Sequence, residues 1–385
     1  MVVYINTQGA RLIKEGRHLL VKKGGDTHHT LFTYKLDQIV IFGNVEISHR
    51  ALAQILRHEI DTVFLTQSGR YLGRLAAPES RNVFLHKKQY ALLDDEAFTM
   101  KMAKSIVEGK MSNMATLLLR IKRSRNAGIA GQKAREIQEL IPLLEKATTI
   151  DSIRGYEGRA SALYFEAFGL GFIEKQSFAR RVRRPPTDPV NSILSLLYTF
   201  LMNRVYAAVR VAALDPYPGF LHTIDYGRYS LVLDLMEEFR TIIADTLALS
   251  LFNLKILNRE DFYQEIPDEQ EDLADTAREN SVDVSKDPIG WISGNAAEAD
   301  FFDIPEQRMD ENQSIPRPTG KYPVKLQPDA FKRVIDAFEK KLTTEFYYPP
   351  AERTLSYADA IIYQAWHCRK VIEGEAQVYQ PVLLK

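Results

Sequence analysis

The side chains in this sequence that could act on a phosphate group, judged by their type and spacing, are carboxylates and an imidazole. They fall into three clusters, which contain Glu157, His222 and the pair Asp234 and Glu237. Divalent cations accept carboxylate oxygens and imidazole nitrogens as ligands, and such a cation can polarise a phosphodiester. The three clusters therefore point to metal-dependent chemistry on phosphate.

The first cluster places a single acid, Glu157, among small residues. These neighbours are Gly155, Gly158, Ala160, Ser161 and Ala162. Small residues allow a second helix to come close, and a carboxylate in such a seam needs a cation to offset its lost hydration. The alternative interpretation is a surface carboxylate paired with Arg154, three residues earlier.

The other two clusters lie close together in the sequence. Asp234 and Glu237 are one turn apart on a predicted helix, so their like charges are either solvated or held together by a cation. The same helix face also carries Ser230, Thr241 and Asp245. His222 precedes this helix in a predicted loop, where a single histidine is more often hydrogen-bonded or solvated than a metal ligand.

Two basic runs could grip phosphate groups. One contains Arg180, Arg181, Arg183 and Arg184, and the other contains Arg120, Lys122, Arg123 and Arg125. Their alternative role is a solvated face or a set of cations at the carboxyl end of a helix. The motifs GxxxxGK[ST], GxGxxG, HExxH and GxSxG do not occur, so nucleotide and serine hydrolysis lose their usual support.

The net charge of zero hides an uneven distribution. Residues 260–311 contain 17 acidic and 3 basic side chains, so the rest of the chain carries 47 basic and 33 acidic ones. A basic body suits a nucleic-acid partner.

The single cysteine, Cys368, excludes an internal disulfide and fits a reducing compartment. We expect a cytoplasmic protein with no membrane span, because no run of 18 or more apolar residues occurs.

The elements that must position these residues predict an α+β protein. Residues 1–80 hold short β-rich runs separated by glycines, which favours a β-sandwich-like domain with one helix at 48–57. In residues 81–385 the apolar residues recur at three and four spacing, which is typical of a mostly helical domain. The acidic, proline-containing stretch at about 260–320 is expected to be a flexible insertion in that domain.

The predicted boundaries can be given element by element. Strands are expected at 2–5, 11–13, 18–22, 31–34, 38–42, 62–65 and 71–74. Helices are expected at 81–125, 131–147, 152–168, 190–214, 229–253, 329–343 and 356–373.

Taken together, the clusters resemble the CRISPR adaptation integrase family, the universal CRISPR-associated endonuclease. The resemblance rests on Arg154-Gly-Tyr-Glu157-Gly-Arg-Ala-Ser-Ala-Leu-Tyr164, Asp188-Pro-Val-Asn191, Leu196-Leu-Tyr198, Gly219-Phe-Leu-His222 and Ser230-Leu-Val-Leu-Asp234-Leu-Met-Glu237-Glu238-Phe-Arg240. It spans residues 1 to about 255 in order, and the segment from Gly374 to Val382 resembles the end of the family. The acidic stretch is longer than the family pattern.

The resemblance implies a metal-dependent DNA endonuclease and integrase of antiviral defence. Such an enzyme inserts short captured duplexes as new spacers into a CRISPR array by transesterification. The binding of Mn²⁺ or Mg²⁺ is carried over to Glu157, His222 and Glu237, and catalysis to these three and Asp234. We expect Asp234 to neighbour the metal or to hold a ligating water. The candidates for DNA phosphate contacts are Arg180, Arg181, Arg183 and Arg184.

The resemblance also implies partners. These are double-stranded DNA, a second copy of the chain bound through the β-rich domain, and a small ferredoxin-like CRISPR-associated partner dimer in a heterohexamer-type complex. Two alternatives stay open. A related integrase of a mobile element would share every catalytic residue, and a non-catalytic DNA-binding scaffold would leave the acidic clusters as solvated faces. We hypothesise that the acidic stretch limits non-specific DNA binding.

Overall fold

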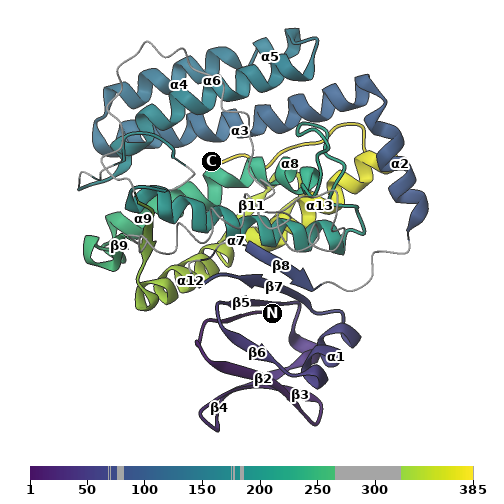
Figure 1. The fold of residues 1–385 in the computed structure, drawn as a ribbon. Helices are drawn as coiled ribbons and strands as arrows, with labels where there is room; N and C mark the ends of the chain where they lie inside the picture. Colours follow the sequence, from purple (N-terminus) through teal and green to yellow (C-terminus); the bar gives the residue numbers. More distant parts are fainter. Residues whose placement is uncertain are drawn as a thin grey trace, which may run out of the picture. The chain divides into compact units, whose positions relative to one another are not determined.

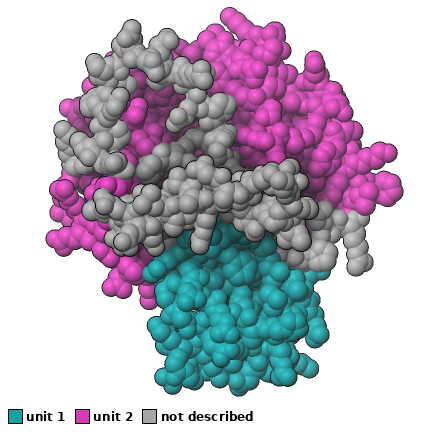
Figure 2. Space-filling model, viewed as in Figure 1, with its two compact units in different colours: residues 1–81 teal, residues 82–385 magenta. Residues whose placement is uncertain are grey.

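The computed structural model describes residues 1–67, 69, 71–75, 82–174, 176, 178–182, 186–264 and 322–384. The chain divides into two compact units, Met1–Arg81 and Asn82–Lys385, which Figure 2 colours separately. The first unit is built mainly of strands and the second mainly of helices (Figure 1). The predicted α+β fold class is confirmed.

The first unit consists of two four-stranded sheets that share one apolar core. One sheet has the strand order β1-β5-β7-β8, in which β1 and β7 pair with β5 in parallel and β8 pairs with β7 antiparallel. The other sheet has the order β4-β3-β2-β6. Its strands alternate side chains between the two faces, which places Ala10 and Leu12 of β2 in the core with Ile39 and Ile41 of β5.

The strands and the helix of this unit lie close to their predicted positions. They are β1 (Val2–Ile5), β2 (Ala10–Glu15), β3 (His18–Lys23), β4 (Asp26–Phe32), β5 (Gln38–Phe42), β6 (Val45–Ile47), α1 (His49–Arg57), β7 (Asp61–Leu65) and β8 (Tyr71–Leu75). Two differences stand out. Strand β6 was not predicted, and the strand predicted at 31–34 overlaps only the end of the longer β4, since Thr33–Lys35 form a 3₁₀ helix. The first five residues of β4 are exposed, so this strand carries no apolar pattern that would reveal it.

The second unit is arranged around the long helix α3, which packs against α4, α6 and α8. Its helices are α2 (Val83–Leu93), α3 (Glu96–Arg125), α4 (Gly128–Leu140), α5 (Leu143–Lys146), α6 (Ile150–Phe168), α7 (Pro189–Val211), α8 (Ser230–Phe239), α9 (Thr246–Asn253), α12 (Pro328–Leu342) and α13 (Tyr357–Glu373). Two short antiparallel pairs that were not predicted complete it. They are β9 (Phe262–Gln264) with β10 (Val324–Leu326), and β11 (Glu345–Tyr348) with β12 (Arg353–Ser356).

Three of the predicted helices are interrupted for local reasons. The helix predicted from 81 to 125 ends at Leu93 and restarts at Glu96, because the Asp95 side chain accepts a hydrogen bond from the Phe98 amide and caps α3. The helix predicted at 131–147 divides at Pro142, which cannot donate a backbone hydrogen bond. The helix predicted at 229–253 is interrupted between α8 and α9, where the chain forms a π-helical segment at Arg240–Asp245.

The acidic stretch predicted at about 260–320 falls, from residue 265 onward, outside the described residues. The described strands on its two sides pair with each other, with Gln264 opposite Val324. Among the described residues, the helix α7 is long and apolar enough to cross a membrane by length and composition. In its most apolar window, 78% is buried inside the protein, as is usual for a core helix.

Candidate active site

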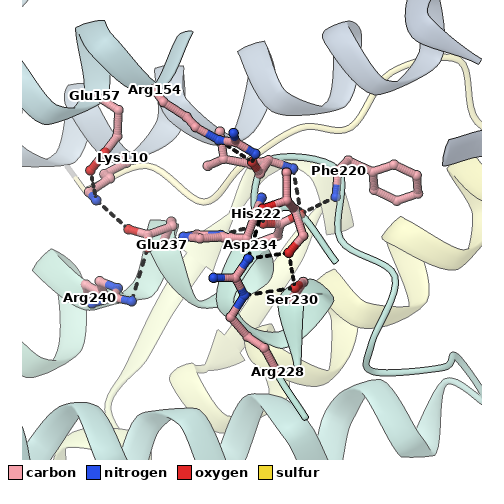
Figure 3. A network of polar contacts seen from close by, with 12 residues as sticks. Lys110, Arg154, Glu157, Phe220, His222, Arg228, Ser230, Asp234, Glu237 and Arg240 are labelled. Carbon is pink, nitrogen blue, oxygen red and sulfur yellow. Dashed lines mark hydrogen bonds and ion pairs between the residues drawn. The ribbon is translucent and has the colours of Figure 1, made fainter. Parts of the chain in front are cut away.

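Three helices of the second unit bring together the side chains of Glu157, Lys110 and Glu237 (Figure 3). Glu157 lies on α6, Lys110 in the middle of α3, and Glu237 on α8. The Lys110 ammonium lies 2.6 Å from Oε2 of Glu237 and forms a second ion pair with Oε1 of Glu157. All three side chains are buried, since their exposed fractions are 6%, 3% and 1% respectively. The two carboxylates therefore share one buried cation.

The histidine loop is attached to α8 through the carboxylate of Asp234 (Figure 3). Oδ2 of Asp234 accepts hydrogen bonds from the backbone amides of Phe220 at 2.5 Å and Leu221 at 2.9 Å. Oδ1 accepts from the His222 amide at 2.9 Å and lies 2.7 Å from Nδ1 of the His222 ring. Because a carboxylate only accepts, Nδ1 carries the proton, and Nε2 is left to face Oε1 of Glu237 at 4.0 Å.

Further contacts fix this loop from both sides. Arg154, on α6, donates from Nε and Nη2 to the Leu221 carbonyl at 2.9 and 2.6 Å. Ser230, the first residue of α8, donates to the Thr223 carbonyl at 2.8 Å. Gly219 packs so tightly that a Cβ atom there would lie 2.6 Å from the Ser230 carbonyl carbon. The position of His222 is thus set by α6 and α8 together.

The charges around Glu237 keep it ionised. Burial alone would raise the pKa of this carboxyl, but the neighbouring cations Arg240 and Lys110 lower the pKa to about 2. Arg240 lies 3.1 Å from Oε1 of Glu237, and its guanidinium stacks over the Tyr198 ring at 5.0 Å. Both Glu237 oxygens lie beside cations without the geometry of a hydrogen bond. A buried carboxylate of this kind retains lone pairs for a further cation.

Two of the predicted residues, Glu157 and Glu237, contact the same ammonium, and a third, His222, lies 4.0 Å from Glu237. Glu157 lies in a helix seam, and the alternative of a surface pair with Arg154 is wrong, because Arg154 contacts Asp151 and the Leu221 carbonyl instead. The solvated-face alternative for Asp234 and Glu237 is also wrong, since both are 1% exposed. Asp234 does not point to the shared cation; it holds the backbone and the ring of His222.

Asp245, which the helical spacing placed on the same face, belongs to a different cluster. It is buried and accepts hydrogen bonds from the hydroxyls of Tyr164 at 2.8 Å and Tyr198 at 2.7 Å. The π-helical segment between Glu237 and Asp245 adds a residue per turn, so three and four spacing no longer keeps side chains on one face.

Lys110 is the site residue that the sequence did not reveal. It stands in the run Val107-Glu-Gly-Lys110-Met of a long helix, where a lysine is usually a solvated side chain. The only hint is its apolar surroundings, since Ile106, Val107, Met111 and Met114 are all buried on the same helix. A lysine among buried neighbours needs an acidic partner, and here it has two.

The predicted phosphate-binding arginines differ from one another. Arg180 is exposed. Arg181 donates instead to Oδ1 of Asn191 at 2.8 Å and to Oγ of Ser195 at 3.0 Å, both within the protein. Arg183 and Arg184 lie outside the described residues.

The donor set fits a divalent cation. Two buried carboxylates and an imidazole nitrogen are donors that suit Mn²⁺, and the oxygens also suit Mg²⁺. Two ligands of one ion at about 2.1 Å are at most about 4.2 Å apart, and Nε2 of His222 lies 4.0 Å from Glu237 Oε1. Among the described residues no three acidic or histidine groups enclose an ion directly. The Lys110 ammonium contacts both glutamates.

The fold and the site define an α+β protein whose helical unit holds a buried cluster of two glutamates, a histidine and a lysine. The family described as CRISPR associated protein Cas1 matches residues 3–283. A relative from Thermus thermophilus, a CRISPR-associated endonuclease Cas1, is 30% identical over 386 residues, covering 100% of this chain and 97% of the relative. The chain belongs to the Cas1 family, so the family expected from the sequence is confirmed.

Solved structures show the same fold at low sequence identity. A Cas6-RT-Cas1–Cas2 complex matches with a TM-score of 0.76 and 22% identity, covering 100% of this chain and 36% of that chain. A casposase bound to its integration product matches with a TM-score of 0.75 and 18% identity, covering 98% and 92%.

Proposed function

We propose that this protein is a metal-dependent DNA endonuclease and integrase, which inserts captured duplexes as spacers into a CRISPR array by transesterification. The observation that carries the proposal is that Glu157 and Glu237 share one buried ammonium and that His222 lies 4.0 Å from Glu237, in a member of the Cas1 family. The relative from Thermus thermophilus is named an endonuclease, which supports DNA cleavage.

The proposed ligands of Mn²⁺ or Mg²⁺ are Glu157, His222 and Glu237. A bound divalent cation would polarise the phosphodiester and stabilise the charge that develops on its oxygens. Asp234 holds the Nδ1 proton of His222, so the ring presents the Nε2 lone pair toward Glu237. Arg240, which lies 3.1 Å from Oε1 of Glu237, keeps this carboxylate ionised and in place. These contacts organise the ligands before DNA binds, and Asp234 is a positioning residue.

Further parts of the proposal concern the DNA substrate, the protein partners and the location of the protein. Double-stranded DNA, both captured fragments and the repeat, is the proposed substrate, with phosphate contacts proposed for Arg180, Arg183 and Arg184. We further infer a homodimer through the β-rich unit and a heterohexamer-type complex with a small ferredoxin-like partner dimer. The name of the Cas1–Cas2 neighbour supports a partner complex of this type. The proposed location is the cytoplasm, without membrane insertion.

The burial of the site favours this function over a non-catalytic DNA-binding scaffold. Taking Glu157, Glu237 and Lys110 out of water is costly, and replacing such groups by apolar side chains often leaves stability unchanged or improves it. A scaffold that only binds DNA has no need of this arrangement. A mobile-element integrase remains the other enzyme of this type, and a CRISPR array beside the gene would separate the two.

Strand transfer tests the proposed function. A short duplex with free 3′-hydroxyls is incubated with a supercoiled plasmid carrying the cognate repeat, the small partner and Mn²⁺. We expect joined product with the wild type and none with Glu157→Ala or His222→Ala. The matched control is Glu166→Ala, on the same helix as Glu157 but exposed and paired with Lys133, which should retain the product. If the wild type binds DNA without cutting or joining it, the scaffold interpretation becomes the better one.

A further inference from the structure

Lys110 connects the two glutamates of the candidate metal site. Among the described residues, it is the cation whose ammonium contacts both carboxylates, through Oε1 of Glu157 and Oε2 of Glu237. The lysine side chain is 3% exposed, so the contact is shielded from water. The three residues come from α3, α6 and α8, which makes this contact a tertiary one that joins three helices.

The ammonium offsets a repulsion that the fold would otherwise carry. Glu157 and Glu237 are both buried and contact the same ammonium, and two like charges that share a poorly solvated site disfavour the folded chain. A single positive charge between them removes much of this penalty, and the carboxylates in turn stabilise a lysine that burial would disfavour. Lys110 thus supplies the positive charge that offsets the two carboxylates in this structure.

The ammonium and a divalent cation would compete for the same two carboxylates. An ion bound by both glutamates would lie close to the lysine ammonium, and the two positive charges would repel each other. Each carboxylate also has a second partner that can keep it in place without Lys110. The Ser161 hydroxyl donates to Glu157 Oε1 at 2.9 Å, and Arg240 lies 3.1 Å from Glu237 Oε1.

We propose that Lys110 is the placeholder cation of this site: its ammonium holds Glu157 and Glu237 together until a divalent ion displaces it. The inference rests on the proposed metal-binding function and deepens it. Lys110 is a positioning residue that lowers the affinity for the ion and, in exchange, keeps the ligands arranged in the metal-free protein. Loss of the lysine should thus strengthen metal binding and weaken the metal-free fold.

The first test is the affinity for Mn²⁺ alone, measured by isothermal titration calorimetry on the full chain without DNA. We expect Lys110→Met to bind Mn²⁺ roughly tenfold or more tightly than the wild type, because a competing charge is gone. The matched control is Lys104→Met on the same helix, whose ammonium donates to the Glu145 carbonyl, and its affinity should equal that of the wild type. Equal or weaker binding by Lys110→Met would overturn the proposal.

The second test is thermal unfolding with and without Mn²⁺. This measurement gives a result even if a variant folds poorly without the metal ion. Metal-free Lys110→Met should melt below the wild type, and saturating Mn²⁺ should remove most of that difference by mass action. Lys110→Gln, whose amide still donates a hydrogen bond, should show a smaller loss of melting temperature. If both variants stay unfolded in Mn²⁺, the ion cannot replace the ammonium and the proposal is wrong.

One further variant separates this inference from the proposed function. Glu157→Gln removes a ligand while leaving Lys110 in place, and it should weaken Mn²⁺ binding. If Mn²⁺ binds the wild type and Glu157→Gln equally, the metal site itself is misassigned. If Glu157→Gln binds more weakly and Lys110→Met binds no more tightly than the wild type, the metal site stands and only the placeholder role fails.

Discussion

The Asp234 carboxylate binds both the ring and the backbone of His222, with Oδ1 2.7 Å from Nδ1 and 2.9 Å from the amide nitrogen. One acidic side chain therefore fixes the tautomer of the imidazole and the path of its loop. The oxygen Oδ2 extends this hold to the two preceding residues, Phe220 and Leu221. These contacts fix the position of His222 more firmly than is usual for a residue on a loop.

Asp234→Asn should impair the site without removing a proposed ligand. One carboxylate oxygen becomes an amide donor that faces N–H groups, so either the loop amides or the His222 ring loses its acceptor. We expect Mn²⁺ affinity and strand transfer to fall by roughly 10- to 100-fold, the usual range for partners that orient a metal ligand. The exposed Asp225→Asn in the same loop is the control and should behave as wild type. Unchanged ¹⁵N shifts of the His222 ring in Asp234→Asn would contradict this role.

Gly219→Ala should displace the histidine loop through a steric clash. A Cβ atom at this position would lie 2.6 Å from the Ser230 carbonyl carbon and 2.8 Å from its oxygen. Backbone atoms cannot swing aside as a side chain can, so we expect a loss of about 1 to 3 kcal/mol in the free energy of unfolding. Strand transfer should fall by up to about 100-fold, because small displacements of a catalytic group are costly.

Gly155→Ala is the matched control for this substitution. Gly155 lies two residues before Glu157 on α6, and a Cβ atom there would meet nothing within 4 Å. The helix should become slightly more stable, because alanine has the higher helix propensity. If Gly219→Ala unfolds in urea at the same midpoint as wild type and retains strand transfer, the loop tolerates the extra atom and the steric argument is wrong.

The sequence revealed the chemical groups of the site better than their contacts. Glu157 among small residues predicted a close helix seam, because small side chains leave a recognisable pattern. Lys110 could not be found in this way, since its partners are 47 and 127 residues away and only the packing of α3 against α6 and α8 joins them. The role of Asp234 depends on a loop conformation, and the separation of Asp245 depends on a π-helical segment, neither of which follows from helical spacing.

The pH dependence of stability should carry a contribution from Glu238, the neighbour of Glu237. Burial raises the pKa of this carboxyl from 4.5 to about 7, although Tyr379, the Val382 amide and Gln364 donate hydrogen bonds that oppose the shift. Between these pH values the folded chain holds a proton that the unfolded chain has lost. The resulting stabilisation is complete below about pH 4.5 and disappears as the pH rises through about 7.

Urea unfolding at several pH values between about 5 and 8 checks this sign. The free energy of unfolding of the wild type should fall over this range, and the fall should be smaller in Glu238→Gln, by about 1 to 3 kcal/mol. Buried Asp188 and Asp245 also have raised pKa values, so the difference between variant and wild type is the informative quantity. The exposed Glu139→Gln should show the wild-type slope. Parallel curves for wild type and Glu238→Gln would rule out this contribution.

Arg180 and Arg181 should give opposite results although they are adjacent. Arg180 is exposed, and we expect Arg180→Ala to weaken binding to random duplex DNA. The slope of the logarithm of the binding constant against the logarithm of the salt concentration should decrease by about the amount of one phosphate contact. The melting temperature should not change. Arg181 donates to Asn191 and Ser195 and stacks on the Tyr198 ring at 5.4 Å. Arg181→Ala should therefore lower the stability by about 1 to 3 kcal/mol.

Fluorescence anisotropy at several salt concentrations and thermal unfolding separate the two effects. The exposed Arg135→Ala, on α4, serves as a charge-matched control for both measurements. Because loss of a phosphate contact acts on binding and loss of an internal hydrogen bond acts on folding, each variant should change one measurement much more than the other. A salt slope for Arg180→Ala equal to that of Arg135→Ala would remove Arg180 from the DNA path. An unchanged melting temperature for Arg181→Ala would leave its guanidinium available for phosphate.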